Sequence, residues 1–281
     1  MLWQRVVTAV ALLLVLLPAL FYPSPAPFCV VAMVFIAAGA WEWARLTAYG
    51  SATALATGLL ATAVCTAAWA FGLLERPLLG GWVLAALLWV VGGAWLLYRG
   101  PDGLRALPRP WRLVLGLVVL CTAWLAVAQA RTIGTNFLLS VMVLVWVADV
   151  GAYFAGRRWG GRLIARKLAP AISPGKSWEG VAGGMLGVLV LSLAWRWADV
   201  HWQADTPSIY TELARTLHWL VWPAILALAA MSVVGDLLES LVKRVAGAKD
   251  SSGLLPGHGG VLDRLDALLP TFPLALLLHA L

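Results

Sequence analysis

Long apolar stretches alternate with short polar ones along the whole chain, and this pattern predicts helices that cross a membrane. An α-helix needs about 20 mainly apolar residues to cross roughly 30 Å of hydrocarbon. Nine stretches approach that length, and they cover residues 6–22, 28–46, 54–73, 81–97, 113–130, 136–155, 181–197, 217–235 and 265–281. We therefore expect an all-α, polytopic integral membrane protein with about nine transmembrane helices.

The composition argues against a soluble domain. Of the 281 residues, 62% are hydrophobic and only 12% are charged, which is about half the charged fraction of ordinary soluble domains. The mean hydropathy is +0.88. The first apolar stretch resembles a secretory signal, with Arg5 before it and Pro23 after it. Because further apolar stretches follow at once, an uncleaved first helix is the better interpretation.

The net charge of +7 is explained by the loops. With the N-terminus inside, 16 of the 20 Lys and Arg residues fall in cytoplasmic segments and four fall outside. Cytoplasmic loops of membrane proteins carry such an excess. We therefore expect the N-terminus inside, the C-terminus outside, and no nucleic-acid partner.

The chain divides by chemistry into two parts. Residues 1–135 have short loops and few ionisable groups within the apolar stretches, so we interpret them as a scaffold of transmembrane helices. Residues 136–281 contain two long cytoplasmic segments, about 156–180 and 238–264, that are rich in Gly, Pro, Ser and charge. Function is expected in these segments.

The eighth apolar stretch continues into a polar stripe. At 3.6 residues per turn, Asp236, Glu239, Ser240 and Lys243 share one helix face. The stripe is either part of an active site or an ordinary helix end, in which Glu239 and Lys243 form an i,i+4 pair. Spacing alone does not decide between these two interpretations.

A Gly-rich segment follows, and Asp263 and Asp266 then stand on one helical face. Backbone N–H groups in such a turn can meet phosphate oxygens. Carboxylates without a Cys or His cluster favour Mg²⁺, so we expect Asp236, Asp263 and Asp266 to hold magnesium, with a second cation as an option. His258 either contacts phosphate, donates a proton or caps the turn.

The other cytoplasmic segment begins near Asp149 and is basic. Arg157, Arg158 and Lys176 suit an anionic lipid headgroup or a nucleotide, although the positive-inside bias explains any single one of them equally well. Gly175, Lys176 and Ser177 are similar to the end of a Walker A motif. Pro170 stands where that motif needs glycine, so a P-loop is excluded.

Residues 240–266 resemble the signature of the phosphatidate cytidylyltransferase family, the CDP-diacylglycerol synthases. The matching residues are Ser240, Lys243, Arg244, Lys249, Asp250, Pro256, His258, Gly259, Gly260, Asp263, Arg264 and Asp266. Residues 149–180 are also similar to a second segment of that family, through Tyr153, Gly156, Leu168, Ala169, Pro170, Ser173, Pro174, Gly175, Lys176, Trp178, Glu179 and Gly180. Leu238 and Ala267 depart from the pattern without removing a charged group.

The resemblance implies transfer of a cytidylyl group from CTP to phosphatidate, which gives CDP-diacylglycerol and pyrophosphate. It implies a catalytic set of Asp236, Ser240, Lys243, Arg244, Lys249, Asp250, His258, Asp263, Arg264 and Asp266. Substrate binding is expected from Asp149, Tyr153, Arg157, Arg158, Ser173, Lys176, Ser177, Glu179, Gly259 and Gly260.

The expected partners are CTP, phosphatidate and membrane lipid. A homodimer is one option for the assembly. The expected location is the bacterial cytoplasmic (inner) membrane, with the active site facing the cytoplasm. Two alternatives stay open at this point. One is another CTP-dependent enzyme acting on a lipid, such as a polyprenol or phytol kinase, and the other is a secondary transporter, whose intramembrane acids bind ions.

Overall fold

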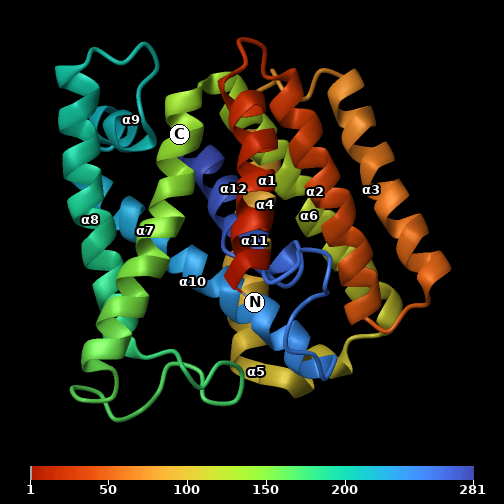
Figure 1. Cartoon of the computed structure of the whole chain (residues 1–281). Coiled ribbons are helices and arrows are strands. Elements are labelled where there is room, and N and C mark those ends of the chain that lie inside the picture. Colours follow the sequence, from red (N-terminus) through yellow and green to blue (C-terminus); the bar gives the residue numbers. More distant parts are fainter. Residues whose placement is uncertain (1) are drawn as a thin grey trace.

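The computed structural model describes residues 2–281, and these form helices joined mostly by short loops, with two long loops over residues 160–177 and 246–261 (Figure 1). The elements are α1 (Leu2–Phe21), α2 (Ala26–Leu46), α3 (Ser51–Ala70), α4 (Leu79–Leu87), the π-helical turn η1 (Leu88–Gly92), α5 (Gly93–Ala106), α6 (Arg109–Ile133), α7 (Thr135–Trp159), α8 (Trp178–His201), α9 (Ile209–Thr216), the 3-10 turn η2 (His218–Leu220), α10 (Val221–Val245), α11 (Leu262–Leu265) and α12 (Leu268–His279). Within the described residues there is no β-strand, so the expected all-α fold is confirmed.

Eight helical stretches are long and apolar enough to cross a membrane, and each overlaps one of the first eight predicted stretches. The ninth prediction is wrong in length. Residues 265–281 contain the 12-residue helix α12, which rises only about 18 Å at 1.5 Å per residue. Asp266 and Ala267, which separate α11 from α12, keep helical dihedral angles, but Pro270 has no N–H to donate to the backbone oxygen of Asp266 four residues earlier.

Small residues bring neighbouring helices close together. A Cβ atom on Gly151 of α7 would lie 2.9 Å from the backbone oxygen of Gly183 in α8, and one on Gly184 would lie 2.6 Å from the oxygen of Ala148. Helix pairs in membranes commonly approach through such residues. The α7–α8 pair is therefore closely packed, and it holds the loop between its two helices at the lower end of Figure 1.

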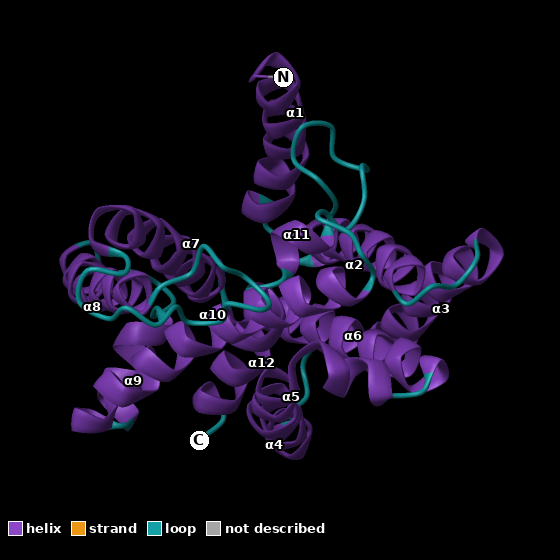
Figure 2. Cartoon of the chain, turned by 90° about the horizontal axis from the view of Figure 1, so that it is seen from below, coloured by secondary structure: helices purple, strands orange, loops and turns teal. Residues whose placement is uncertain are grey.

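Helices from both halves of the sequence share one core. Viewed from below, α7 and α8 lie on one side, α2, α3 and α6 on the other, and α10 and α12 between them (Figure 2). The helix α12 packs against α4 and α6, and α10 packs against α5. The sequence division at residue 135 is therefore not a spatial division.

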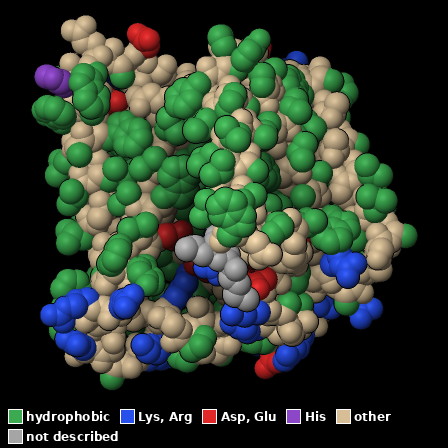
Figure 3. Space-filling view, in the orientation of Figure 1, with side chains coloured by type: hydrophobic (Ala, Val, Ile, Leu, Met, Phe, Trp, Pro, Cys, Tyr) green, Lys and Arg blue, Asp and Glu red, His purple; other side chains and the backbone are tan. Residues whose placement is uncertain are grey.

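The surface has an apolar belt and a basic end. Exposed Leu, Val, Phe and Trp side chains cover much of the visible face, whereas most Lys and Arg side chains gather toward its lower part (Figure 3). An apolar surface of this extent fits a lipid environment rather than water. The chain is a membrane protein, and its basic end is the end at which the predicted polar segments lie.

Candidate active site

The polar stripe on α10 is buried in the protein rather than forming an ordinary helix end. Lys243 forms ion pairs with Glu239 and Asp263, and its Nζ lies 2.6 Å from Oδ1 of Asp263. The Glu239 and Asp263 side chains are 5% and 7% exposed. One turn earlier, the hydroxyl of Ser240 donates to Asp236 at 3.3 Å. The i,i+4 pair of Glu239 and Lys243 is thus present, but it is buried and joined to Asp263, and the catalytic role of the stripe stays a prediction.

Asp263 is held by donors on both of its carboxylate oxygens. Oδ2 accepts hydrogen bonds from the backbone N–H and hydroxyl of Ser251, each at 2.9 Å, and from the N–H of Gly260 at 2.8 Å. Burial alone would raise the pKa of Asp263, but the Lys243 ammonium and these N–H groups outweigh it and lower the pKa to about 2. Asp263 is therefore a fixed negative charge at neutral pH.

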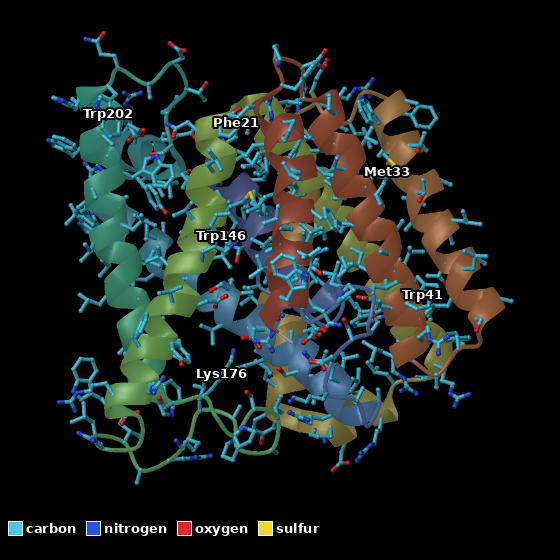
Figure 4. All side chains as sticks on the ribbon, viewed as in Figure 1. Phe21, Met33, Trp41, Trp146, Lys176 and Trp202 are labelled. Atoms are coloured by element: carbon cyan, nitrogen blue, oxygen red, sulfur yellow. The ribbon has the colours of Figure 1, made fainter. Side chains whose placement is uncertain are left out.

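A second group of charges lies beside the first. Lys176, from the loop before α8, pairs with Asp236 at 2.5 Å, and it is labelled at the lower end of the bundle in Figure 4. Asp149 and Asp266 lie close enough to Asp236 for their charges to act on one another. Three carboxylates from three separate segments thus lie near one another, and among the described residues Lys176 forms an ion pair with Asp236.

The two predicted cytoplasmic segments are joined at this site. The Arg244 guanidinium donates to the backbone oxygen of Ile172 at 3.1 Å. The Ile172 side chain is buried with Leu104 of α5 and with Leu241 and Val242 of α10. This packing holds the loop that carries Lys176 against α10. Lys176 is thereby placed within ion-pairing distance of Asp236.

The Gly-rich turn differs from expectation. Gly257 and Gly259 have φ angles of 77° and 83°, which favour glycine. The N–H of Gly260 does not point to open space for a phosphate, because it donates to Asp263. The prediction that this turn offers its N–H groups to a phosphate is therefore wrong for Gly260, since a carboxylate of the chain already occupies that position.

Sequence reasoning missed Glu42 of α2. Its side chain is completely buried, and it accepts the N–H groups of Val261 at 2.9 Å and Leu262 at 2.7 Å. It also accepts the hydroxyl of Ser252, and the hydroxyl of Ser251, whose single proton is shared with Asp263, lies 3.1 Å from its Oε2. A signal was present, because an acid within an apolar stretch usually has a polar partner, but Glu42 belongs to the half interpreted as scaffold.

Several predicted substrate-binding residues lie apart from these charges. Tyr153 and Arg157 contact each other at 3.0 Å on the exposed surface of α7, and Arg158 lies over the ring of Trp159. Each of these contacts is local to the end of α7. The structure does not bring the three residues to Asp236 or Asp263, and their role in binding stays a prediction.

Others have structural tasks. Ser177 caps α8 by accepting the N–H of Gly180 at 3.1 Å. Glu179 accepts three N–H groups from residues 161–164, at 2.9 to 3.1 Å. The half-buried Ser173 lies in the turn that follows Ala169 and is hydrogen-bonded to it through the backbone. Ser173, Ser177 and Glu179 therefore hold the conformation of the loop before α8.

The remaining signature residues border the site. Lys249 and Asp250 are exposed. The backbone oxygen of His258 accepts a guanidinium N–H of Arg264 at 2.8 Å. Among the described residues, Nδ1 of the His258 ring is buried without a hydrogen-bond partner. His258 and Arg264 thus form the outer edge of the turn that holds Asp263.

Comparison with known proteins identifies the chain. A model of the "Cytidylyltransferase family" matches residues 3–281. The chain belongs to this cytidylyltransferase family. A protein of Pseudomonas aeruginosa named phosphatidate cytidylyltransferase is 40% identical over 97% of this chain and 95% of its own length. A protein of the same name from Haemophilus influenzae is 48% identical over 50% of this cytidylyltransferase and 44% of its own length. Another, from Bacillus subtilis, is 39% identical over 53% of this cytidylyltransferase and 49% of its own length.

Proposed function

We propose that this cytidylyltransferase acts on phosphatidate. A phosphate oxygen of phosphatidate attacks the α-phosphorus of CTP, the bond from that phosphorus to the β-phosphate oxygen breaks, and CDP-diacylglycerol and pyrophosphate are released. The observation that carries the proposal is the 40% identity, over nearly the whole chain, to a protein named phosphatidate cytidylyltransferase. The buried acid–base site at one end of a membrane bundle supports it, because the reaction joins a polar and a lipid substrate.

The chemistry needs positioning more than proton transfer. The attacking phosphate is already ionised near neutral pH, so electrostatic stabilisation of the transferring phosphoryl group is the main requirement. Lys176 and Lys243 offset the carboxylates beside them. Arg244 and Lys249 lie at the exposed edge, where they are suited to meet the triphosphate of CTP.

We also propose that magnesium takes part. Among the described residues, no three His, Cys, Asp or Glu side chains already surround one point as a metal site would. The donor chemistry nevertheless fits, because Asp149, Asp236 and Asp266 supply hard oxygen ligands, and Lys176 pairs with Asp236 among them. Asp236 and Asp266 would hold the ion, and Asp263 would join them only by exchanging its contact with Lys243.

When bound, magnesium would neutralise charge on the departing pyrophosphate. A second cation stays a prediction.

An apolar cavity beside the site is suited to an acyl chain. Its volume is about 300 Å³, and α1, α2, α6, α7 and α12 contribute its walls. Of the described residues that line it, Arg264 alone is charged, and Trp146 of α7 borders it (Figure 4). We place an acyl chain of phosphatidate in this cavity, with the Arg264 guanidinium toward its phosphate.

The proposed location is the bacterial inner membrane, with the site facing the cytoplasm. The gathering of Lys and Arg at the end that carries the site supports this orientation (Figure 3), and the relatives named above are bacterial. A homodimer stays a prediction.

Position-specific labelling of CTP tests the proposed reaction. With purified protein and phosphatidate in mixed micelles, label at the α-phosphate should enter the lipid, and label at the γ-phosphate should appear in pyrophosphate. A CTP-dependent lipid kinase would instead transfer the γ-phosphate and release CDP. Lipid that carries only the γ label would therefore contradict the proposal.

A further inference from the structure

Glu42 is joined to the Asp263 turn from a distant part of the chain. It lies near the end of α2, more than 200 residues before the residues that it contacts. Val261 donates to its Oε1 and Leu262 to its Oε2, so each carboxylate oxygen accepts a different backbone N–H group. Such donors offset the large cost of burying a carboxylate.

The same residues that contact Glu42 also contact Asp263. The hydroxyl oxygen of Ser251 lies 3.1 Å from Oε2 of Glu42 and 2.9 Å from Oδ2 of Asp263. Gly260 donates its N–H to Asp263, and a Cβ atom on Gly260 would stand only 2.4 Å from Oε1 of Glu42. The two carboxylates therefore enclose this turn between them.

Among the described residues, no Lys, Arg or His forms an ion pair with Glu42. Its partners are instead the backbone and hydroxyl groups that set the conformation of the turn. A residue that served only to fill space between α2 and α11 would not need a charge, because an apolar side chain would fill that space at lower cost.

We propose that Glu42 is a positioning residue for cytidylyl transfer, which through Ser251 and the turn at Gly260 fixes Asp263 beside Lys243. This inference rests on the proposed function. It assigns the N-terminal half a direct part in the site, beyond its role as scaffold.

The contact geometry makes Glu42→Gln a sharp test. An amide has one oxygen and one NH₂ group, and each carboxylate oxygen of Glu42 faces a backbone N–H. Either orientation of the glutamine amide therefore places NH₂ against a donor that cannot rotate away. Glu42→Asp keeps the charge but is one methylene shorter, so it should retain part of the function.

The matched control is Gln129→Ala. Gln129 of α6 is also buried, and its side-chain amide donates to the backbone oxygens of Leu73 at 2.6 Å and Arg76 at 3.0 Å. It thus ties two segments together as Glu42 does, but away from Asp263. A general loss of stability should appear in both variants, whereas a loss of positioning should appear only at Glu42.

The test combines kinetics with hydrogen exchange on the full-length protein in detergent. Glu42→Gln should lower kcat about 100-fold, as misplacement of a reacting group by roughly 1 Å does, with KM for CTP changed far less. Glu42→Asp should recover part of kcat, and Gln129→Ala should keep it. Without substrate, amides of residues 251–262 should exchange faster in Glu42→Gln but not in Gln129→Ala.

A double variant adds an independent measure. Because Glu42 and Ser251 act on Asp263 as one unit, Glu42→Gln combined with Ser251→Ala should lose little more than the worse single variant. Wild-type kcat in folded Glu42→Gln, or an equal loss of kcat in Gln129→Ala, would overturn the proposal. If Glu42→Gln does not fold, wild-type kcat in Ser251→Ala would overturn it.

Hydrogen exchange is read without substrate, so it tests the contact with the turn even if the wild-type protein fails to make CDP-diacylglycerol. Inactive wild-type protein would contradict the proposed function, whereas unchanged exchange in Glu42→Gln would contradict the role of Glu42.

Discussion

Lys243→Met removes the cation that pairs with two buried carboxylates. The Lys243 side chain is 14% exposed, and its partners Glu239 and Asp263 are 5% and 7% exposed. Methionine fills a similar volume and leaves both acids without their shared ammonium group. Packing is therefore largely kept, and the variant isolates the electrostatic contribution.

The size of the effect follows from burial. Removing one partner of a buried ion pair destabilises a protein by about 3–5 kcal/mol, because the other charge stays buried and uncompensated. Asp263 keeps its contacts with Ser251 and Gly260, so Glu239 should account for most of the loss. Replacing Glu239 by Gln in the same protein should recover part of it.

The free energy of unfolding can be compared by SDS titration monitored by circular dichroism. We expect Lys243→Met to lose about 3–5 kcal/mol and nearly all turnover, and Lys243→Met/Glu239→Gln to regain stability but not turnover. Arg105→Met is the control, because the side chains of Arg105 and Asp102 are 59% and 93% exposed. Exposed ion pairs of this kind add little to the free energy of unfolding. Wild-type stability in Lys243→Met would refute the reasoning.

Three further results are expected. Gly260→Ala should abolish turnover and lower the unfolding midpoint, because its Cβ would lie 2.0 Å from the hydroxyl of Ser251; a fully active variant would contradict this contact. Asp236→Asn should lower kcat by at least about 100-fold with an unchanged helical spectrum, and a near-normal kcat would remove Asp236 from the site. The stability that separates wild type from Asp263→Asn should be constant above about pH 5, fall below about pH 4 and be largely lost at pH 2, because the depressed pKa of Asp263 is about 2; a difference at pH 2 as large as that at pH 7 would contradict the charge assignment.

Local sequence patterns predicted the parts of this protein that depend on local chemistry. The length of the apolar stretches predicted eight membrane-spanning helices. The spacing of Asp236, Ser240 and Lys243 predicted the polar face of α10. The length of the ninth stretch was misjudged because hydropathy does not register Pro270, which has no N–H to continue the backbone hydrogen bonds from Asp266.

Contacts between segments that are distant in the sequence could not be predicted from it. Nothing near residue 42 indicates that its carboxylate accepts the N–H groups of residues 261 and 262. The Gly-rich turn looked suited to phosphate because the sequence does not reveal that Asp263 and Glu42 fill it. The pairing of Lys176 with Asp236 likewise depends on the packing of Ile172 against α10.

The central claim is that the site around Asp263 transfers the cytidylyl group of CTP to phosphatidate. The most direct measurement follows CDP-diacylglycerol and pyrophosphate together, with wild type and Asp263→Asn in mixed micelles containing magnesium. The account predicts that wild type forms the two products in equal amounts, that both require phosphatidate and magnesium, and that Asp263→Asn forms neither while remaining folded. Equal rates for Asp263→Asn and wild type, or pyrophosphate without the lipid product, would contradict it.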